Sequence, residues 1–157
     1  MTEARTHFVR AEPLSAAAFR PFGDVVEAGV VAHLELRGGE VFNLDVLSYD
    51  HRPLRVDHLN RHHQATQALI PLDAKPCVLV VAPPAVDFSA PSHLDEVRAF
   101  VLDGSVGINL HLGVWHEGPF ALGPHVDLAN FQGAHVTGDN EVAHLERDLG
   151  VVVEVLA

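Results

Sequence analysis

The sequence is poor in the residues that mark several common classes of protein. It contains one cysteine, Cys77, so no disulfide can form within the chain. Basic residues are scarce, because 10 Lys and Arg stand against 21 Asp and Glu, for a formal net charge of −11 with neutral histidines. General binding to nucleic acid or to anionic membranes needs clustered positive charge. The composition therefore argues against both kinds of partner.

Long apolar runs are also missing. The longest, residues 77–82, is far shorter than the roughly 20 residues that a membrane-spanning helix needs. The first seven residues are polar and contain no apolar core of a signal peptide. Together with the single cysteine, these features predict a cytoplasmic protein.

Histidine, by contrast, is abundant. The chain has 12 histidines in 157 residues, against one Trp, one Tyr and one Met. Its length and its 48% hydrophobic content predict one globular domain, residues 1–157. Histidine titrates near neutrality and is the commonest metal ligand, so its positions indicate where to look for function.

The pattern of elements predicts a mainly all-β fold with a short N-terminal helix. Residues 14–22 favour that helix, with Ser15 as its cap and Pro21 and Gly23 at its end. Short runs rich in Val, Leu, Ile and Phe then alternate with turn residues, which favours a β-sandwich or barrel. The expected strands are residues 24–30, 41–48, 65–71, 77–82, 97–102, 108–114, 125–131 and 151–156.

The first polar cluster spans residues 60–67. Asn60 and His62 are two apart, so on a strand they share a face and can converge on a small ligand or a metal. The alternative is a polar strand edge with His63 and Gln64 in solvent, and the cluster taken alone favours this alternative.

The second cluster spans residues 107–117. Asn109 and His111 are expected on one strand face, opposite Ile108 and Leu110. This alternation predicts either a polar pocket backed by an apolar layer or an ordinary half-buried strand next to Trp115.

Several other kinds of site find no support in the sequence. It has no Gly-rich phosphate loop, no Cys pair for structural zinc and no His-Glu-x-x-His helix. Cys77 begins an apolar run and is expected to be buried and inert.

Four segments in order resemble the ureidoglycolate lyase family. They are Phe-Arg-Pro-Phe-Gly-Asp-Val-Val-Glu at 19–27, Arg-His through Thr-Gln-Ala-Leu-Ile-Pro-Leu at 61–72, Val-Arg-Ala-Phe-Val at 97–101, and Gly-Ile-Asn through Val-Trp-His at 107–116. The resemblance implies a cupin-like double-stranded β-helix, or jelly roll, that forms a homodimer. It also implies a lyase that eliminates urea from the small molecule ureidoglycolate to give glyoxylate.

The resemblance also implies a site. Asn60, His62 and Gln67 occupy the positions of the first cupin motif, and His116 ends the second. A divalent metal, nickel in the family, is expected on His62, Gln67 and His116, with no other cofactor. Because this set lacks carboxylate and thiolate ligands, it should hold the ion loosely.

The implied roles follow the chemistry of the reaction. The histidines serve as acid–base groups or metal ligands, amides hydrogen-bond the hydroxyl or the ureido group, and an arginine holds the carboxylate. The expected catalytic residues are His62, His116 and Asn109, and the expected substrate-binding residues are Arg61, Gln67, Arg98 and His111.

Three departures from the family keep other functions open. Asn60 stands where the family has Glu, His63 where it has Pro, and Glu117 where it more often has His. One alternative is another cupin enzyme that acts on a small carboxylate with a loosely held divalent metal. The other is a non-catalytic cupin that binds a small molecule, which the loss of Glu at position 60 favours.

Overall fold

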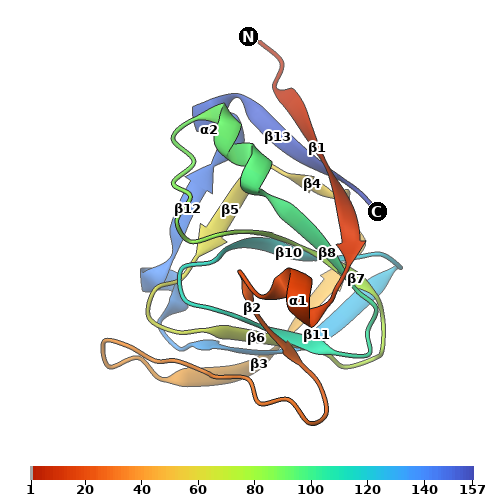
Figure 1. Ribbon diagram of the computed structural model, residues 1–157, viewed down its shortest axis with the longest axis vertical. Coiled ribbons are helices and arrows are strands. Elements are labelled where there is room, and N and C mark those ends of the chain that lie inside the picture. Colours follow the sequence, from red (N-terminus) through yellow and green to blue (C-terminus); the bar gives the residue numbers. More distant parts are fainter. Residues whose placement is uncertain (1) are drawn as a thin grey trace.

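Two β-sheets make up most of the protein in a computed structural model that describes residues 2–157 (Figure 1). The large sheet has the order β12-β5-β10-β7-β8-β1-β13-β4, and the small sheet has the order β2-β9-β6-β11-β3. The strands are β1 Arg5–Pro13, β2 Gly23–Val26, β3 Phe42–Asp50, β4 Arg55–Val56, β5 His58–Arg61, β6 Gln67–Pro71, β7 Cys77–Ala82, β8 Arg98–Leu102, β9 Gly107–Leu110, β10 Trp115–Ala121, β11 His125–Gly133, β12 Glu141–His144 and β13 Val151–Leu156.

The chain passes repeatedly from one sheet to the other. It runs from β5 in the large sheet to β6 in the small one, back to β7 and β8, then to β9, β10 and β11 in alternation. In Figure 1, β3, β6 and β11 lie below β7 and β10, so the two sheets face each other. This alternation between facing sheets is that of a jelly roll, and the expected mainly all-β, cupin-like fold is confirmed.

The expected N-terminal helix is present but shorter. α1 spans Ala16–Phe19, and the Ser15 hydroxyl accepts a hydrogen bond from the Ala18 N–H at 3.2 Å, as a cap should. Three short helical elements were not predicted, because each is four to six residues long and has no extended apolar periodicity. They are η1 Pro91–Glu96, η2 Val136–Asp139 and α2 Leu145–Leu149.

The strand predicted over residues 108–114 is wrong in extent. β9 ends at Leu110, and the chain turns before β10 begins at Trp115. Gly113 has a φ of +76°, which ordinary L residues rarely adopt, and it allows this turn. His111 therefore lies in a turn and not on the strand face of Asn109.

The large sheet is covered on both faces. Leu79 and Val81 of β7 join the apolar core between the sheets, whereas Val78 and Val80 join a second core on the opposite face. The uninterrupted apolar run of β7 follows from this double coverage. No helix in residues 2–157 is long and apolar enough to cross a membrane.

Candidate functional site

A cavity of about 400 Å³ opens between the two sheets. Its walls come from β3, β5, β6, β10 and β11 and from the segment around η2. The structure brings together here four residues that the two cupin motifs predict, although they are up to 56 positions apart. The lining residues are Leu47, Tyr49, Asn60, His62, Gln67, His116, Glu117, Gly118, Gln132, Val136, Thr137 and Asn140.

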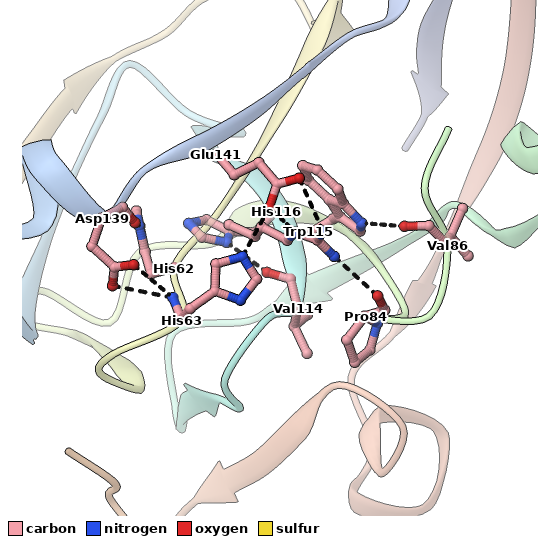
Figure 2. Close-up of polar contacts among 10 residues, drawn as sticks. His62, His63, Pro84, Val86, Val114, Trp115, His116, Asp139 and Glu141 are labelled. Atoms are coloured by element: carbon pink, nitrogen blue, oxygen red, sulfur yellow. Dashed lines mark hydrogen bonds and ion pairs between the residues drawn. The ribbon is translucent and has the colours of Figure 1, made fainter. Parts of the chain in front are cut away.

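Two imidazoles face this cavity with one nitrogen each left free. His62 Nδ1 lies 3.1 Å from the Asp139 carbonyl oxygen, and His116 Nδ1 lies 3.1 Å from the Val114 carbonyl oxygen (Figure 2). A carbonyl oxygen only accepts, so both Nδ1 atoms carry the proton. Each Nε2 therefore has a lone pair, which makes it a base or a metal ligand. The ring centroids are 5.1 Å apart.

Burial keeps both imidazoles neutral. Burial, and to a smaller extent the neighbouring His62, lowers the pKa of His116 to about 4. Burial also lowers the pKa of His62 below its usual range. A charged imidazole would lose its hydration there, so the neutral base is the stable form at pH 7.

Gln67 contributes a buried oxygen to the same site. Its Nε2 donates to Asn130 Oδ1 at 2.9 Å and to Gln132 Oε1 at 3.3 Å. Its Oε1 is buried and has no hydrogen-bond partner in the protein. A buried polar atom without a partner in the protein is costly, which makes this oxygen a candidate acceptor for a ligand.

The chemistry of these three residues would suit a loosely held divalent ion. Imidazole nitrogen suits nickel and zinc, and backbone carbonyls orient metal-binding imidazoles in the way that Asp139 and Val114 do here. Within residues 2–157 no group of three or more His, Cys, Asp or Glu could hold a metal ion. The donor set is therefore two neutral imidazoles and one amide oxygen.

Arg61 and Arg98, expected to bind the substrate carboxylate, lie away from the cavity. Arg61 forms two hydrogen bonds to Glu141, at 2.8 and 3.0 Å, and its guanidinium carbon lies 4.1 Å from the centre of the Trp115 ring. Arg98 pairs with Glu12. Strand alternation turns Arg61 to the side opposite His62.

Asn109 and His111 were expected to share one face of the pocket, but neither of them lines the cavity. Asn109 is fully buried, and its Nδ2 donates to Asp24 Oδ2 at 3.0 Å and to the His33 carbonyl oxygen at 3.1 Å. It therefore anchors the segment that precedes β3. His111 pairs with Asp24 at 3.2 Å and does not line the cavity, although it borders a narrow gap together with His62 and His116.

Glu117 lines the cavity, although in the sequence it stands out only as a departure from the family. Its Oε2 lies 2.6 Å from His58 Nε2, and its Oε1 accepts the Gly118 N–H at 2.8 Å. Among the described residues that line the cavity, it carries the one carboxylate. Strand alternation would separate it from His116, but the pairing of β10 is irregular between Glu117 and Phe120. The sequence feature that could have identified Glu117 as a cavity residue is its position directly after His116.

The fold and this cavity define a jelly-roll protein with a small polar cavity that two neutral imidazoles face. A family model described as ureidoglycolate lyase matches residues 33–153. The chain belongs to the ureidoglycolate lyase family.

Individual relatives agree with this family. The chain is 37% identical over 136 residues to a protein named ureidoglycolate lyase from Burkholderia mallei, covering 74% of this chain and 77% of that one. It is 34% identical over 130 residues to a protein of the same name from Azotobacter vinelandii, covering 71% and 76%. A solved structure of RmlC from Streptococcus suis is similar at a TM-score of 0.39 and 15% identity, over 60% of this chain and 44% of that one.

Proposed function

We propose that this protein is a ureidoglycolate lyase, which eliminates urea from ureidoglycolate to give glyoxylate. The observation that carries the proposal is the pair of neutral imidazoles, His62 and His116, whose free Nε2 atoms face one cavity. Family membership and relatives named for this activity support the choice of substrate.

The reaction needs one proton to be moved. Ureidoglycolate carries a hydroxyl, a ureido nitrogen and a carboxylate on one carbon. The hydroxyl loses its proton as the carbonyl forms, the carbon–nitrogen bond breaks with its electron pair on nitrogen, and that nitrogen gains a proton. The products are glyoxylate and urea, and no water is consumed.

His62 is the group that we assign to this proton. Its Nε2 takes the hydroxyl proton, and the imidazolium that results donates a proton to the departing urea nitrogen. The pKa of His62 is lowered by burial, but His62 is less buried than His116, so it is the better base of the two. His116 stays neutral, and its Nε2 accepts a hydrogen bond from the substrate.

Neutral donors of the cavity hold the substrate carboxylate in this account. The Thr137 hydroxyl and the Asn60 amide line the cavity, whereas Arg61 and Arg98 are engaged elsewhere. The alternative that we propose is that His62, His116 and Gln67 hold a divalent ion, with nickel implied by the family resemblance, and in that case the His62 Nε2 is a ligand and not the base. When bound, such an ion would supply positive charge to the carboxylate and the hydroxyl.

We further propose that the protein is a cytoplasmic homodimer. The outer face of the small sheet supports the dimer, because Leu44 and Val46 of β3 are 61% and 55% exposed. Exposed apolar side chains that cluster on one sheet face are typical of an interface between subunits. The buried, unpaired Cys77 agrees with a reducing compartment.

The proposal is tested by glyoxylate release from racemic ureidoglycolate, measured with a chelator and with added nickel. We expect release from one enantiomer. Equal rates in the two conditions would assign His62 and His116 to acid–base work, and loss of the rate in chelator would assign them to metal ligation. No glyoxylate in either condition would contradict the proposal.

A further inference from the structure

We infer that Asp45 and Asn130 are positioning residues that fix the Gln67 amide with its oxygen toward the ligand. The cavity would then select a substrate that places an N–H group at Gln67. The inference rests on the proposed function only for the identity of that group, which is a ureido N–H.

A chain of three hydrogen bonding groups sets the direction of each amide. Asn130 Nδ2 donates to Asp45 Oδ1 at 2.7 Å. An ionised carboxylate only accepts, so Asn130 must turn its NH₂ toward Asp45 and its oxygen toward Gln67. Gln67 must then donate from Nε2, as the 2.9 Å contact shows.

The consequence is a buried acceptor without a partner, on a residue that lines the cavity. Asn130 is 0% exposed and Gln67 is 7% exposed, so neither amide has water available to compensate a wrong orientation. Gln67 Oε1 is buried without a hydrogen bond, although Gln67 lines the cavity. A site built around a buried acceptor rejects ligands that lack the matching donor, because its oxygen is then left unpaired.

Asp45 is the anchor of this chain and the easiest member to change. It is exposed on the edge strand β3 and is not itself among the residues that line the cavity. Asp45→Asn can still bond Asn130 in either orientation, since an amide both donates and accepts. The variant therefore keeps the contact but no longer dictates which way the Asn130 and Gln67 amides point.

Two ligands of equal charge and nearly equal shape measure the effect. Oxamate and pyruvate are both monoanions, and they differ by NH₂ against CH₃. Their dissociation constants are measured by calorimetry in the presence of a chelator, so that Gln67 Oε1 is not occupied by metal. Asp50→Asn, on the same strand, removes the same charge and is the matched control.

We expect the wild-type protein to bind oxamate about tenfold more tightly than pyruvate, which is the effect of one buried hydrogen bond. Asp45→Asn should bring this ratio below about threefold with pyruvate affinity nearly unchanged, and Gln67→Leu should abolish the preference. Asp50→Asn should keep the wild-type ratio. A merely structural role of Asp45 would lower thermal stability and leave the ratio intact.

The inference is overturned by equal affinity for the two ligands in the wild type, by failure to bind oxamate, or by an unchanged ratio in Asp45→Asn. Glyoxylate release is measured separately on the same preparations. Normal turnover without ligand discrimination would remove the inference and leave the proposed function standing. Discrimination between the two ligands without glyoxylate release would support the inference and contradict the proposed function.

Discussion

At the residue scale, the burial of His116 has an energetic cost that depends on pH. The side chain is 8% exposed, and its Nδ1–H donates to the Val114 carbonyl oxygen. Burial lowers its pKa to about 4, from 6.5 in an unfolded chain. Between these values the unfolded chain binds a proton that the folded protein does not, so acid favours unfolding.

We predict that lowering the pH from 7 to 5 costs the wild-type protein about 2 kcal/mol more unfolding free energy than it costs His116→Gln. The stability conferred by the neutral imidazole is fully present above pH 6.5 and is lost as the pH falls toward 4. Urea unfolding of both proteins at the two pH values, in chelator, measures the difference. Titrating groups other than His62, which contacts His116, are common to the two proteins and cancel. Parallel pH dependence would show that His116 is not held neutral.

At the scale of elements, the close pairing of β2 with β9 depends on a residue without a side chain. Gly23 lies opposite Leu110 in the strand register, and a Cβ at Gly23 would meet the Asn109 carbonyl oxygen at 1.9 Å. No side chain fits at that distance, so β2 would have to move away. β2 packs Val25 into the core between the sheets, and Asp24 bonds Asn109.

Gly23→Ala should therefore destabilise the protein by about 2 kcal/mol or more, as overpacking of a tight contact does. Gly123→Ala is the matched control, because a Cβ at Gly123 would meet nothing within 4 Å. Its effect should lie within about 0.5 kcal/mol. Thermal unfolding of the two variants measures both changes, and equal midpoints would refute the role of the close approach.

Local periodicity predicted most of the strands but missed β1, β4, β5, β10 and β12. β1 was missed because its partners are β13, at the other end of the chain, and β8, and a single strand shows nothing of that pairing. The strand over residues 108–114 was overextended because the φ of Gly113 is invisible in a pattern of apolar residues.

The site was predictable only in part for the same reason. His62, Gln67 and His116 could be named because motif positions encode the jelly-roll topology that brings them together. Arg61 and Glu117 were misjudged because the facing of a side chain near a strand end depends on register. Arg61 is held by Glu141 and Trp115, and Glu117 lies at the irregular part of β10.

At the scale of the whole molecule, the outer faces of the two sheets differ. The large sheet is covered by a second apolar core that includes Val151 and Val153 of β13. The small sheet leaves Leu44 and Val46 of β3 exposed to solvent. The uncovered face is the one that a second copy of the chain would bury in the proposed dimer.

The double variant Leu44→Lys, Val46→Lys should convert the dimer to a monomer, because two lysines on each subunit would be desolvated at the interface. Phe8→Lys is the control, since Phe8 is 59% exposed but lies on β1 of the other sheet. Size-exclusion chromatography with light scattering gives the masses. A monomeric wild type, or a double variant that stays dimeric, would contradict the assignment of this face.

The central claim is that the cavity of His62 and His116 eliminates urea by moving one proton. The most direct measurement follows glyoxylate, urea and ammonia together during turnover of ureidoglycolate by the wild type, His62→Gln and Arg61→Met. The account predicts equal amounts of glyoxylate and urea without ammonia, a loss of about 100-fold or more in kcat for His62→Gln, and near-wild-type turnover for Arg61→Met. Release of ammonia in place of urea, or unchanged turnover by a folded His62→Gln variant, would contradict it.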